Sequence, residues 1–290
     1  MISHRYVLLY SLPAVAFTVV FFVFPMLFAG YVSFYEWNGL GAMTFVGWDN
    51  FNHLLHDPVF KKSLRNTLMW ILSAIFLHVP VGLLLALVLA QRPKGWKFFR
   101  TLFFLPNVIS TTALAFLWYF VLHVKLGILN NLFKAVGLGD LTRAWLSDPD
   151  TALFANQLPF ILYVGFTMVV FLTQITSISP DLYEAADLDG ATGLQKDYYI
   201  TMPLLKRTFA MNILFNVAFC LRMFEYPFLM TGGGPVNSTM NMSLYMYKEM
   251  VTANRYGVSM AAGLLTILFG LIIMGAVFGL IRLRERREAA

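Results

Sequence analysis

Polar side chains recur at helical spacing inside an apolar stretch near residue 216. The residues at three- and four-residue spacing are Asn212, Asn216, Phe219, Cys220 and Met223. A helix would place them on one face. Amides can hydrogen-bond the hydroxyls of a sugar while aromatic and sulfur-containing groups cover its C–H faces, so the pattern predicts a site for a sugar-like solute. The alternative for each residue is a packing contact between helices.

Catalytic and metal-binding motifs are absent from the sequence. The single cysteine, Cys220, excludes an internal disulfide, and the five histidines form no cluster with metal-ligand spacing. No phosphate-binding loop, H-E-x-x-H or G-x-S-x-G motif occurs. We therefore expect no catalytic residue, no metal and no cofactor bound by this chain, and any work done here takes its energy from elsewhere.

The segment at about 176–207 is long, polar and rich in helix signals. Residues 179–181, Ser-Pro-Asp, predict an N-cap followed by a helix. Gly190 is expected to take a positive φ after this helix, and a second helix from about Gly193 is expected to stop before Pro203. Two alanines at 185–186 would let another protein's backbone come close. The alternative is a solvated connector.

The elements that carry these residues are membrane-spanning helices. The chain of 290 residues is 59% hydrophobic and 12% charged, where soluble domains are roughly 25% charged. A span needs about 20 mostly apolar residues whose backbone groups pair internally. We find no repeat, and the first stretch is too long for a signal peptide. We expect one all-α transmembrane domain over residues 1–290, with spans at about 7–34, 67–90, 98–121, 153–175, 209–230 and 260–281.

The distribution of basic residues predicts that both termini are cytoplasmic, because cytoplasmic loops carry the excess of Lys and Arg. The 12 basic residues on the expected cytoplasmic side are Arg5, Arg92, Lys94, Lys97, Arg100, Lys196, Lys206, Arg207, Arg282, Arg284, Arg286 and Arg287. The 8 on the opposite side are Lys61, Lys62, Arg65, Lys125, Lys134, Arg143, Lys248 and Arg255. Basic residues beside membrane spans are attracted to anionic lipid, which explains the net charge of +6 without a nucleic-acid partner.

Arg222 and Glu225 are the charged residues near the outer end of the fifth predicted span. They are three positions apart, so one helix side can hold both. We expect a structural ion pair between them.

The polar segment resembles the EAA motif of ABC-importer permeases. The matching residues are Glu184, Ala185, Ala186, Asp189, Gly190, Ala191, Ile200 and Pro203. Met202 stands where the motif usually has leucine, a residue of similar volume. The resemblance implies a type I ABC-importer permease fold with six transmembrane helices and cytoplasmic coupling helices. It also implies that the matching residues couple the permease to an ATPase.

The resemblance extends over nearly the whole chain. It includes Phe45-Val46-Gly47, Asn66-Thr67, Leu105-Pro106, Gly127, Asn130, Trp145, Asp148-Pro149 and Tyr256-Gly257. The outer-loop residues Thr231, Gly233, Gly234 and Pro235 fit a T-x-G-G-P form that is typical of the MalF-like half of carbohydrate importers. An ordinary flexible turn is the plainer interpretation of this run.

The partners implied by the resemblance are a second, MalG-like permease subunit, two ATPase subunits that hold ATP and Mg, and an extracytoplasmic solute-binding protein. The resemblance to maltose-type permeases, counted from the motifs, also implies a substrate path at residues from three spans. They are Asn107, Thr111, Leu162, Tyr163, Phe166, Asn216, Phe219, Cys220 and Met223.

We therefore expect an inner-membrane permease subunit of an ATP-driven importer for a sugar or sugar-like solute. One alternative is an importer of a non-sugar solute such as a glycerol phosphate or polyol. An ion-coupled secondary transporter would need ionisable residues near the midplane and often repeats, of which we see only Arg222 with Glu225 and no repeat. A membrane enzyme would need a clustered catalytic set, and neither of these two explains the EAA spacing.

Overall fold

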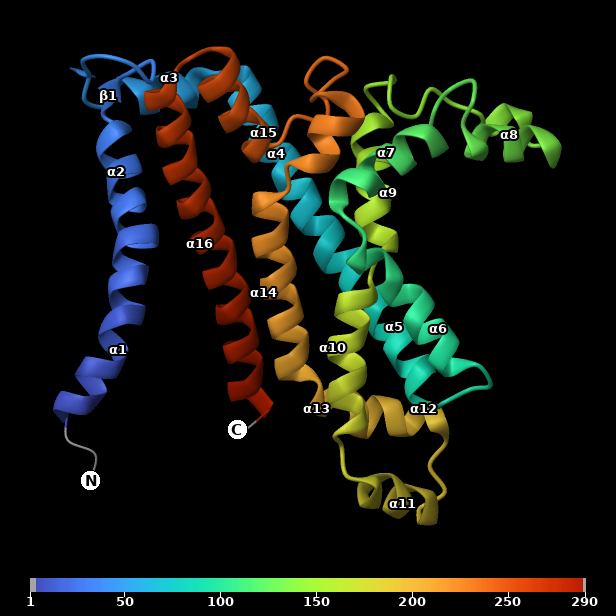
Figure 1. The fold of residues 1–290 in the computed structure, drawn as a ribbon. Coiled ribbons are helices and arrows are strands. Elements are labelled where there is room, and N and C mark those ends of the chain that lie inside the picture. The colour runs from blue at the N-terminus through green and yellow to red at the C-terminus, as the bar shows by residue number, and fades with distance from the viewer. Residues whose placement is uncertain (1–3, 289–290) are drawn as a thin grey trace. The chain divides into compact units, whose positions relative to one another are not determined.

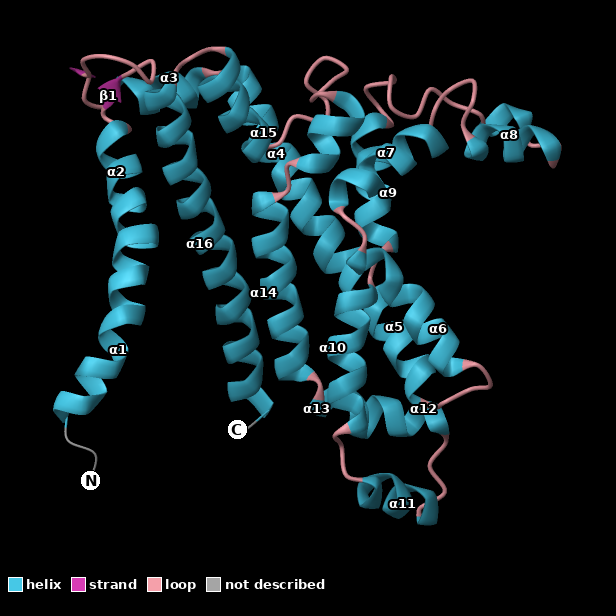
Figure 2. Cartoon of the chain, viewed as in Figure 1, coloured by secondary structure: helices cyan, strands magenta, loops and turns pink. Residues whose placement is uncertain are grey.

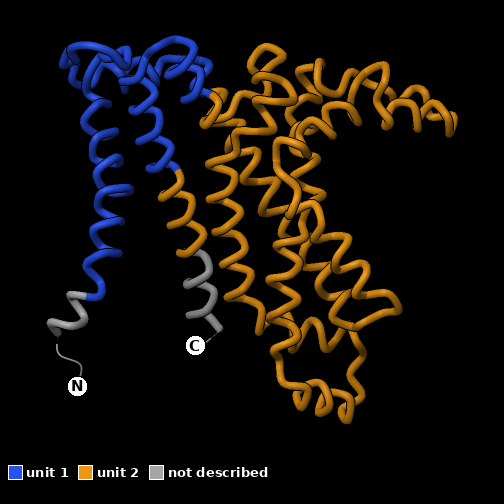
Figure 3. Tube along the Cα trace, in the orientation of Figure 1, with its two compact units in different colours: residues 1–61, 245–269 blue, residues 62–244, 270–290 orange. Residues whose placement is uncertain are grey.

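The structure, a computed structural model, describes residues 4–288 and is mostly helical (Figures 1 and 2). In this described part the strands are β1, Tyr35–Glu36, and β2, Thr44–Phe45, which pair antiparallel with Tyr35 opposite Phe45. The chain forms two compact units (Figure 3). Unit 1 holds residues 1–61 and 245–269, and unit 2 holds residues 62–244 and 270–290. One transmembrane domain over 1–290 stays a prediction.

Unit 1 begins with a long apolar helix and continues into a small folded cap. Its elements include α1 (His4–Thr18), the π-turn η1 (Val19–Val23), α2 (Phe24–Val32) and α3 (Asp49–His56). The Asn50 amide donates to the carbonyls of Ser33 and Tyr35, both at 2.9 Å. Gly257 lies against Tyr35, whose carbonyl oxygen would be 1.9 Å from a Cβ there. A side chain at residue 257 would therefore break this contact.

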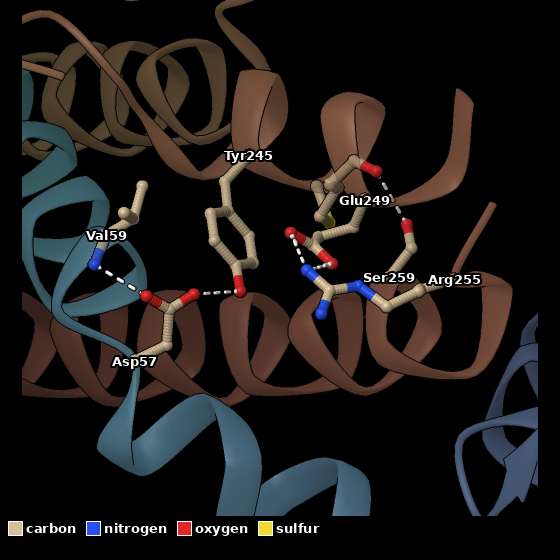
Figure 4. A network of polar contacts seen from close by, with 7 residues as sticks. Asp57, Val59, Tyr245, Glu249, Arg255 and Ser259 are labelled. Carbon is tan, nitrogen blue, oxygen red and sulfur yellow. Dashed lines mark hydrogen bonds and ion pairs between the residues drawn. The ribbon is translucent and has the colours of Figure 1, made fainter. Parts of the chain in front are cut away.

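A polar network fixes the cap of unit 1 (Figure 4). Asp57 accepts from the Tyr245 hydroxyl at 2.6 Å and from the Val59 amide at 2.7 Å. Arg255 pairs with Glu249 at 2.7 Å. Burial, followed by the hydrogen bond to Asp57, raises the pKa of Tyr245. Burial also raises the pKa of Glu249, against the opposing effect of Arg255. These buried polar groups have partners, as a folded cap requires.

Unit 2 contains most of the helices of the chain. The first helices are α4 (Pro58–Ser73), η2 (Ala74–His78), α5 (Val79–Ala90), α6 (Trp96–Phe104), η3 (Leu105–Val108) and α7 (Thr111–Val121). Then follow α8 (Ile128–Ala135), η4 (Gly139–Leu141), α9 (Ala152–Leu162), α10 (Gly165–Thr176), α11 (Pro180–Leu188), α12 (Gly193–Lys196), η5 (Asp197–Thr201) and α13 (Met202–Leu204). The last are α14 (Lys206–Arg222) and η6 (Pro227–Thr231), while α15 (Met242–Tyr247), η7 (Lys248–Thr252) and α16 (Tyr256–Glu288) complete the chain.

Five helices in the described residues are long and apolar enough to cross a membrane, or six with one bent pair. The five are Tyr10–Val32, Pro58–Ala90, Ala152–Thr176, Lys206–Thr231 and Tyr256–Gly279. The apolar stretch predicted as the third span, at about 98–121, is bent in the structure. Trp96–Val108 and Thr111–Val121 meet at a 102° bend, because Ile109 is extended and the Ser110 hydroxyl caps a new helix.

The second helix of the polar segment also differs from its prediction. It continues past Pro203 instead of stopping before it, since α12 leads through the π-turn η5 into α13, which ends at Leu204. Pro203 takes one of the first two positions of α13, where a missing N–H costs least. The connection to α14 is thus almost wholly helical.

Candidate functional site

Unit 2 contains a cavity of about 420 Å³ lined mainly by aromatic and uncharged polar side chains. The aromatic residues are Phe104, Phe160, Tyr163, Phe166, Phe215, Phe219 and Tyr226. The polar and charged residues are His78, Asn107, Thr111, Thr167, Asn216 and Arg222, and Pro106, Ile109 and Leu114 complete the lining. Such a mixture, an apolar surface with a few placed polar groups, is typical of sites for small molecules.

The cavity forms where two spans are interrupted. The bend between α6 and α7 supplies Asn107 and Thr111, and the break between α9 and α10 supplies Tyr163. Gly165 lets the two breaks meet, since a Cβ there would lie 2.2 Å from the Phe103 carbonyl oxygen and 2.5 Å from the Asn107 amide nitrogen. Broken helices at membrane depth are tolerated where they line a cavity, and they mark binding sites in transporters.

Six of the nine residues predicted for the substrate path line this cavity, and three do not. Those that line it are Asn107, Thr111, Tyr163, Phe166, Asn216 and Phe219. Leu162 is exposed outside it. Cys220 is buried and its thiol donates to the Trp70 carbonyl at 3.5 Å, while Met223 is 2% exposed and accepts at its carbonyl from Asn241. The roles of all nine in solute contact stay predictions.

The face of α14 predicted to line a path is mostly its packed face. Asn212, Asn216, Cys220 and Met223 are buried against neighbouring helices. Phe215, Phe219 and Arg222 form the face that borders the cavity, at spacings of four and three residues. Asn216 lies between the two faces. The face of α14 predicted from the sequence is therefore rotated about the helix axis relative to the face that borders the cavity. The reason is that polar residues also serve as packing contacts between spans.

A buried polar group around His78 was missed by the sequence analysis. His78 Nδ1 lies 2.7 Å from the Phe160 carbonyl oxygen and Nε2 lies 3.0 Å from the Thr167 hydroxyl. The His78 ring stacks on Phe160 with centroids 4.4 Å apart, and Phe160 stacks on Phe219 at 5.6 Å. A histidine inside an apolar span was the available signal, since ionisable residues are costly there.

The expected ion pair between Arg222 and Glu225 is not formed. Arg222 is the last residue of α14, and Met223 has a ψ of 119°, so the helical geometry that would bring the two together ends between them. Arg222 borders the cavity and makes no ion pair within the described residues. It is thus a cation available to whatever fills the cavity.

The outer loop after η6 is held in place by long-range hydrogen bonds. The Asn66 amide donates to the carbonyls of Ser238 at 2.9 Å and Met240 at 2.7 Å. Lys62 reaches the Val236 carbonyl at 2.8 Å, and the Thr67 hydroxyl accepts from the Met242 amide at 3.0 Å. Side chains from residues 62–67 therefore hold this loop within unit 2.

The predicted loop residues sit inside this framework. The Thr231 hydroxyl accepts from Asn156 at 3.1 Å and lies 2.6 Å from the Thr239 hydroxyl, which also donates to the Gly234 carbonyl at 2.9 Å. Gly233 is buried with φ +88°, and a Cβ there would be 2.7 Å from the Met240 methyl carbon. Pro235 follows directly and is partly exposed.

The polar segment that resembles the EAA motif, residues 176–207, is called the EAA segment below. It lies at the other end of unit 2 from α8 and the outer loop (Figure 1). Helix α11 starts at Pro180 after Ser179 and ends in a Schellman arrangement, where the Ala191 amide donates to the Ala186 carbonyl at 2.9 Å and the Gly190 amide to the Asp187 carbonyl at 3.0 Å. Gly190 has φ +74°, which confirms the predicted positive φ. Local bonds therefore define the turn.

The following helix, α12, has a side-chain cap at its start. Thr192 and Gln195 form a reciprocal capping box at the start of α12. Lys196 pairs with Asp187, and the Tyr183 hydroxyl bonds that of Thr201 at 2.9 Å. The segment thus holds its shape with its own residues.

The side chains of this segment are largely uncovered. Glu184, Ala185 and Asp189 are exposed, as are Gly190 and Pro203. Ala186, Ala191 and Ile200 are partly exposed. Leu188 and Leu194 are 91% and 83% exposed, the latter just after the turn. An ordered helical tip with exposed apolar side chains has the character of a surface that another protein covers.

The sequence itself matches a known family. Residues 78–287 match the family described as "Binding-protein-dependent transport system inner membrane component". The chain belongs to this family. The matched range includes both the cavity residues and the EAA segment.

Relatives of this permease include sugar transporters. The "Probable ABC transporter permease protein YurN" of Bacillus subtilis (strain 168) is 35% identical over 272 residues, covering 91% of this chain and 92% of YurN. The "Multiple sugar-binding transport system permease protein MsmF" of Streptococcus mutans serotype c (strain ATCC 700610 / UA159) is 33% identical over 262 residues, covering 89% and 88%.

A solved structure has the same fold as this permease. A chain of a bacterial alginate ABC transporter, in complex with an alginate pentasaccharide-bound periplasmic protein, superposes with a TM-score of 0.81 at 28% identity, covering 94% of this chain and 93% of that chain. The expected fold class, a type I ABC-importer permease, is thereby confirmed. The chain is an integral membrane transport subunit and not an enzyme.

Proposed function

We propose that this permease is the MalF-like membrane subunit of an ATP-driven importer, and that it translocates a sugar or sugar-like solute delivered by an extracytoplasmic binding protein. The observation that carries the proposal is the cavity at the two helix breaks. Its stacked aromatic rings, Phe160 and Phe219, lie beside the polar groups of Asn107 and Asn216. Sugars combine C–H faces with hydroxyls in the same way.

The EAA segment supplies the second half of the mechanism. A capped helix with an exposed Glu184 and uncovered leucines suits a groove on an ATPase subunit. Because α12, η5 and α13 lead almost directly into α14, movement of the segment is passed to the helix that carries Asn216 and Phe219. Closure of the ATPases on ATP would thus reshape the cavity.

The proposed assembly contains a second, MalG-like permease, two ATPase subunits and the binding protein. ATP and Mg bind to the ATPases, and this chain binds no cofactor. Phe166, Phe215 and Phe219 border the cavity and are about half exposed, so a second permease is needed to cover them. Both termini face the cytoplasm in this arrangement, as the basic residues favour.

Expression with and without the partner subunits tests the assembly. We expect this chain to be unstable or inactive alone and to co-purify with a MalG-like permease. A homodimer that transports solute with only an ATPase and a binding protein would contradict the heteromeric arrangement.

Substitution of cavity residues tests the translocation site. Asn216→Ala and Phe219→Ala should each raise the KM for uptake about tenfold, the loss of about one hydrogen bond or one stacking surface. Assembly and ATP hydrolysis should persist. Leu162→Ala is the matched control, because Leu162 is in the same predicted set and lies outside the cavity. Parental uptake in both cavity variants would show that these residues only pack.

A charge reversal tests coupling. Glu184→Lys should weaken pull-down of the ATPase subunits and abolish solute-stimulated ATP hydrolysis, since it reverses the charge at the proposed contact. Asp140→Lys is the control, because Asp140 is an exposed acid at the α8 end of unit 2. Equal solute-stimulated ATP hydrolysis in the two variants would favour the alternative that the segment is only a solvated connector.

Arg222 favours a second candidate, an importer of an anionic solute such as a glycerol phosphate. Its guanidinium borders the cavity without a carboxylate partner among the described residues, and guanidinium groups bind phosphate in a bidentate manner. Uptake of glycerol 3-phosphate that exceeds uptake of maltose, and that is lost in Arg222→Leu, would support this candidate. Preferred maltose uptake by the parent would exclude it.

A further inference from the structure

We propose that His78, Thr167 and Asn216 form a directed hydrogen-bond relay that holds the amide carbonyl of Asn216 toward the cavity as an acceptor for a solute hydroxyl. The three side chains come from η2, α10 and α14, and all three line the cavity. The solute-binding part of this inference rests on the proposed function. The relay itself is a property of the unliganded chain.

The relay is buried and continuous. His78 is 5% exposed, Thr167 is 1% exposed and Asn216 is 7% exposed. Thr167 Oγ1 lies 3.0 Å from His78 Nε2 and 3.2 Å from Asn216 Nδ2. Each of these distances is within hydrogen-bond range, so the three polar groups are consecutive members of one chain.

The direction of the relay follows from its first acceptor. The Phe160 carbonyl oxygen can only accept, so His78 Nδ1, 2.7 Å away, carries the proton. The His78 ring is buried against Phe160 and has no carboxylate partner among the residues that the structure describes, which favours the neutral imidazole. Nε2 is then an acceptor, and the Thr167 hydroxyl donates to it. The Thr167 oxygen keeps its lone pairs for Asn216.

Asn216 is oriented by two acceptors. Its Nδ2 donates to Thr167 Oγ1 and also to the Asn212 carbonyl at 2.9 Å. A flipped amide would set Oδ1 against the Asn212 carbonyl oxygen, acceptor against acceptor, so the surroundings select one orientation. Oδ1 then has no hydrogen-bond partner in the described part of the chain. An amide carbonyl held in this way can accept from a solute hydroxyl without first reorienting.

Thr167 suits this task because its two branches point to different neighbours. Its Cγ2 methyl packs on α5, where a Cβ on Gly82 would lie 2.6 Å away, while its hydroxyl joins the relay. Thr167→Val therefore keeps a methyl of similar shape and removes the hydroxyl. Thr167→Ser does the opposite. Thr173→Val on the same helix is a control, since the Thr173 hydroxyl is exposed and donates only to the Val169 carbonyl at 2.8 Å.

Nitrogen NMR of the complete importer tests the relay without any solute. With ¹⁵N-labelled histidine, the His78 signals are those that disappear in His78→Gln. We expect a protonated Nδ1 and an unprotonated Nε2 at neutral pH. The Nε2 signal should shift in Thr167→Val, return in Thr167→Ser and stay in place in Thr173→Val. A protonated Nε2, or no shift in Thr167→Val, would overturn the relay.

Uptake kinetics test whether the relay contributes to solute binding. Proteoliposomes with the complete importer are assayed with maltose, lactose and raffinose in parallel. Loss of about one hydrogen bond should raise the KM about tenfold in Asn216→Ala, and by a similar factor in Thr167→Val, at unchanged maximal rate. Thr167→Ser should restore most of the affinity. The double variant should be no worse than Asn216→Ala alone, because Thr167 acts through Asn216.

The outcomes separate the two proposals. Additive effects of Thr167→Val and Asn216→Ala would show that Thr167 only packs, and would overturn the relay while the cavity keeps its function. A parental KM in Asn216→Ala, or uptake of none of the three sugars, counts against the proposed function. In that case the ¹⁵N NMR result still tests the hydrogen-bond relay, because it is measured without solute.

Discussion

The EAA segment and the outer loop both connect elements of unit 2, and both contain a glycine with positive φ, yet they keep their shapes by opposite means. Gly190 has φ +74° and open space around a would-be Cβ, and its turn is held by bonds within residues 180–204. Gly233 has φ +88° and is packed on Met240, in a loop held by side chains from about 170 residues away. The EAA turn is held by neighbouring residues and leaves its side chains exposed, whereas the outer loop is held by residues far away in the chain.

The outer loop should lose most when its remote support is removed. Asn66→Ala leaves the buried carbonyls of Ser238 and Met240 without their donor. We expect a loss of about 2–3 kcal/mol in the free energy of unfolding, measured by thermal unfolding of the purified complex. Asn131→Ala, at an exposed asparagine on α8, is the control. Equal unfolding midpoints in the two variants would show that the loop holds itself.

The EAA turn should be affected next, through backbone strain alone. Gly190→Val places a β-branched residue at φ +74°, which costs about 1–2 kcal/mol without any collision. Amide exchange should rise across residues 180–204, and solute-stimulated ATP hydrolysis should fall. Gly193→Ala is the control, because a Cβ at residue 193 also meets nothing within 4 Å while the φ of Gly193 is not positive. Unchanged exchange in Gly190→Val would contradict a strained turn.

The capping box gives a smaller effect in the same segment. Thr192→Val removes the side-chain acceptor for the Gln195 amide, at a local cost of about 1 kcal/mol. Faster amide exchange should be confined to residues 193–204. Thr192→Ser keeps a hydroxyl and should behave as the parent does. Destabilisation that extends to the outer loop would mean that the two regions are not independent.

The smallest effect on stability is expected at the exposed tip. Leu188→Ser should change the free energy of unfolding by less than about 0.5 kcal/mol, since Leu188 is 91% exposed. It should still weaken capture of the ATPase subunits. Leu141→Ser, on the α8 side of unit 2, should change neither quantity. Normal ATPase capture in Leu188→Ser would remove the tip from the proposed contact.

Locally encoded features were accessible from the sequence. The apolar stretches coincide with the long apolar helices, and the turn at Gly190 followed from the glycine after a short helix. The 102° bend between α6 and α7 did not follow, because hydropathy measures how apolar a stretch is and not its direction. The long-range support of the outer loop by Asn66 depends on tertiary contacts that no local pattern records.

The cavity was predictable from the sequence only in part. Asn107 and Thr111 were assigned from motif spacing and do border the cavity. On α14 the predicted face was displaced, since a helix that is apolar on most sides gives little contrast between its packed and open faces. His78 was overlooked because its partners, the Phe160 carbonyl and Thr167, belong to another span. The absence of an Arg222–Glu225 pair was missed for a different reason, because it depends on where α14 ends.

Arg222 is the single charged side chain that lines the cavity within the described residues. A neutral sugar in the proposed pathway would carry no charge across the bilayer, so the membrane potential would do no work on it. An anion would meet an inside-negative potential with a cost of about 2.3 kcal/mol per charge for each 100 mV. Uptake that is unchanged when a potassium diffusion potential is imposed on the vesicles would thus identify an electroneutral cargo before its chemical structure is known.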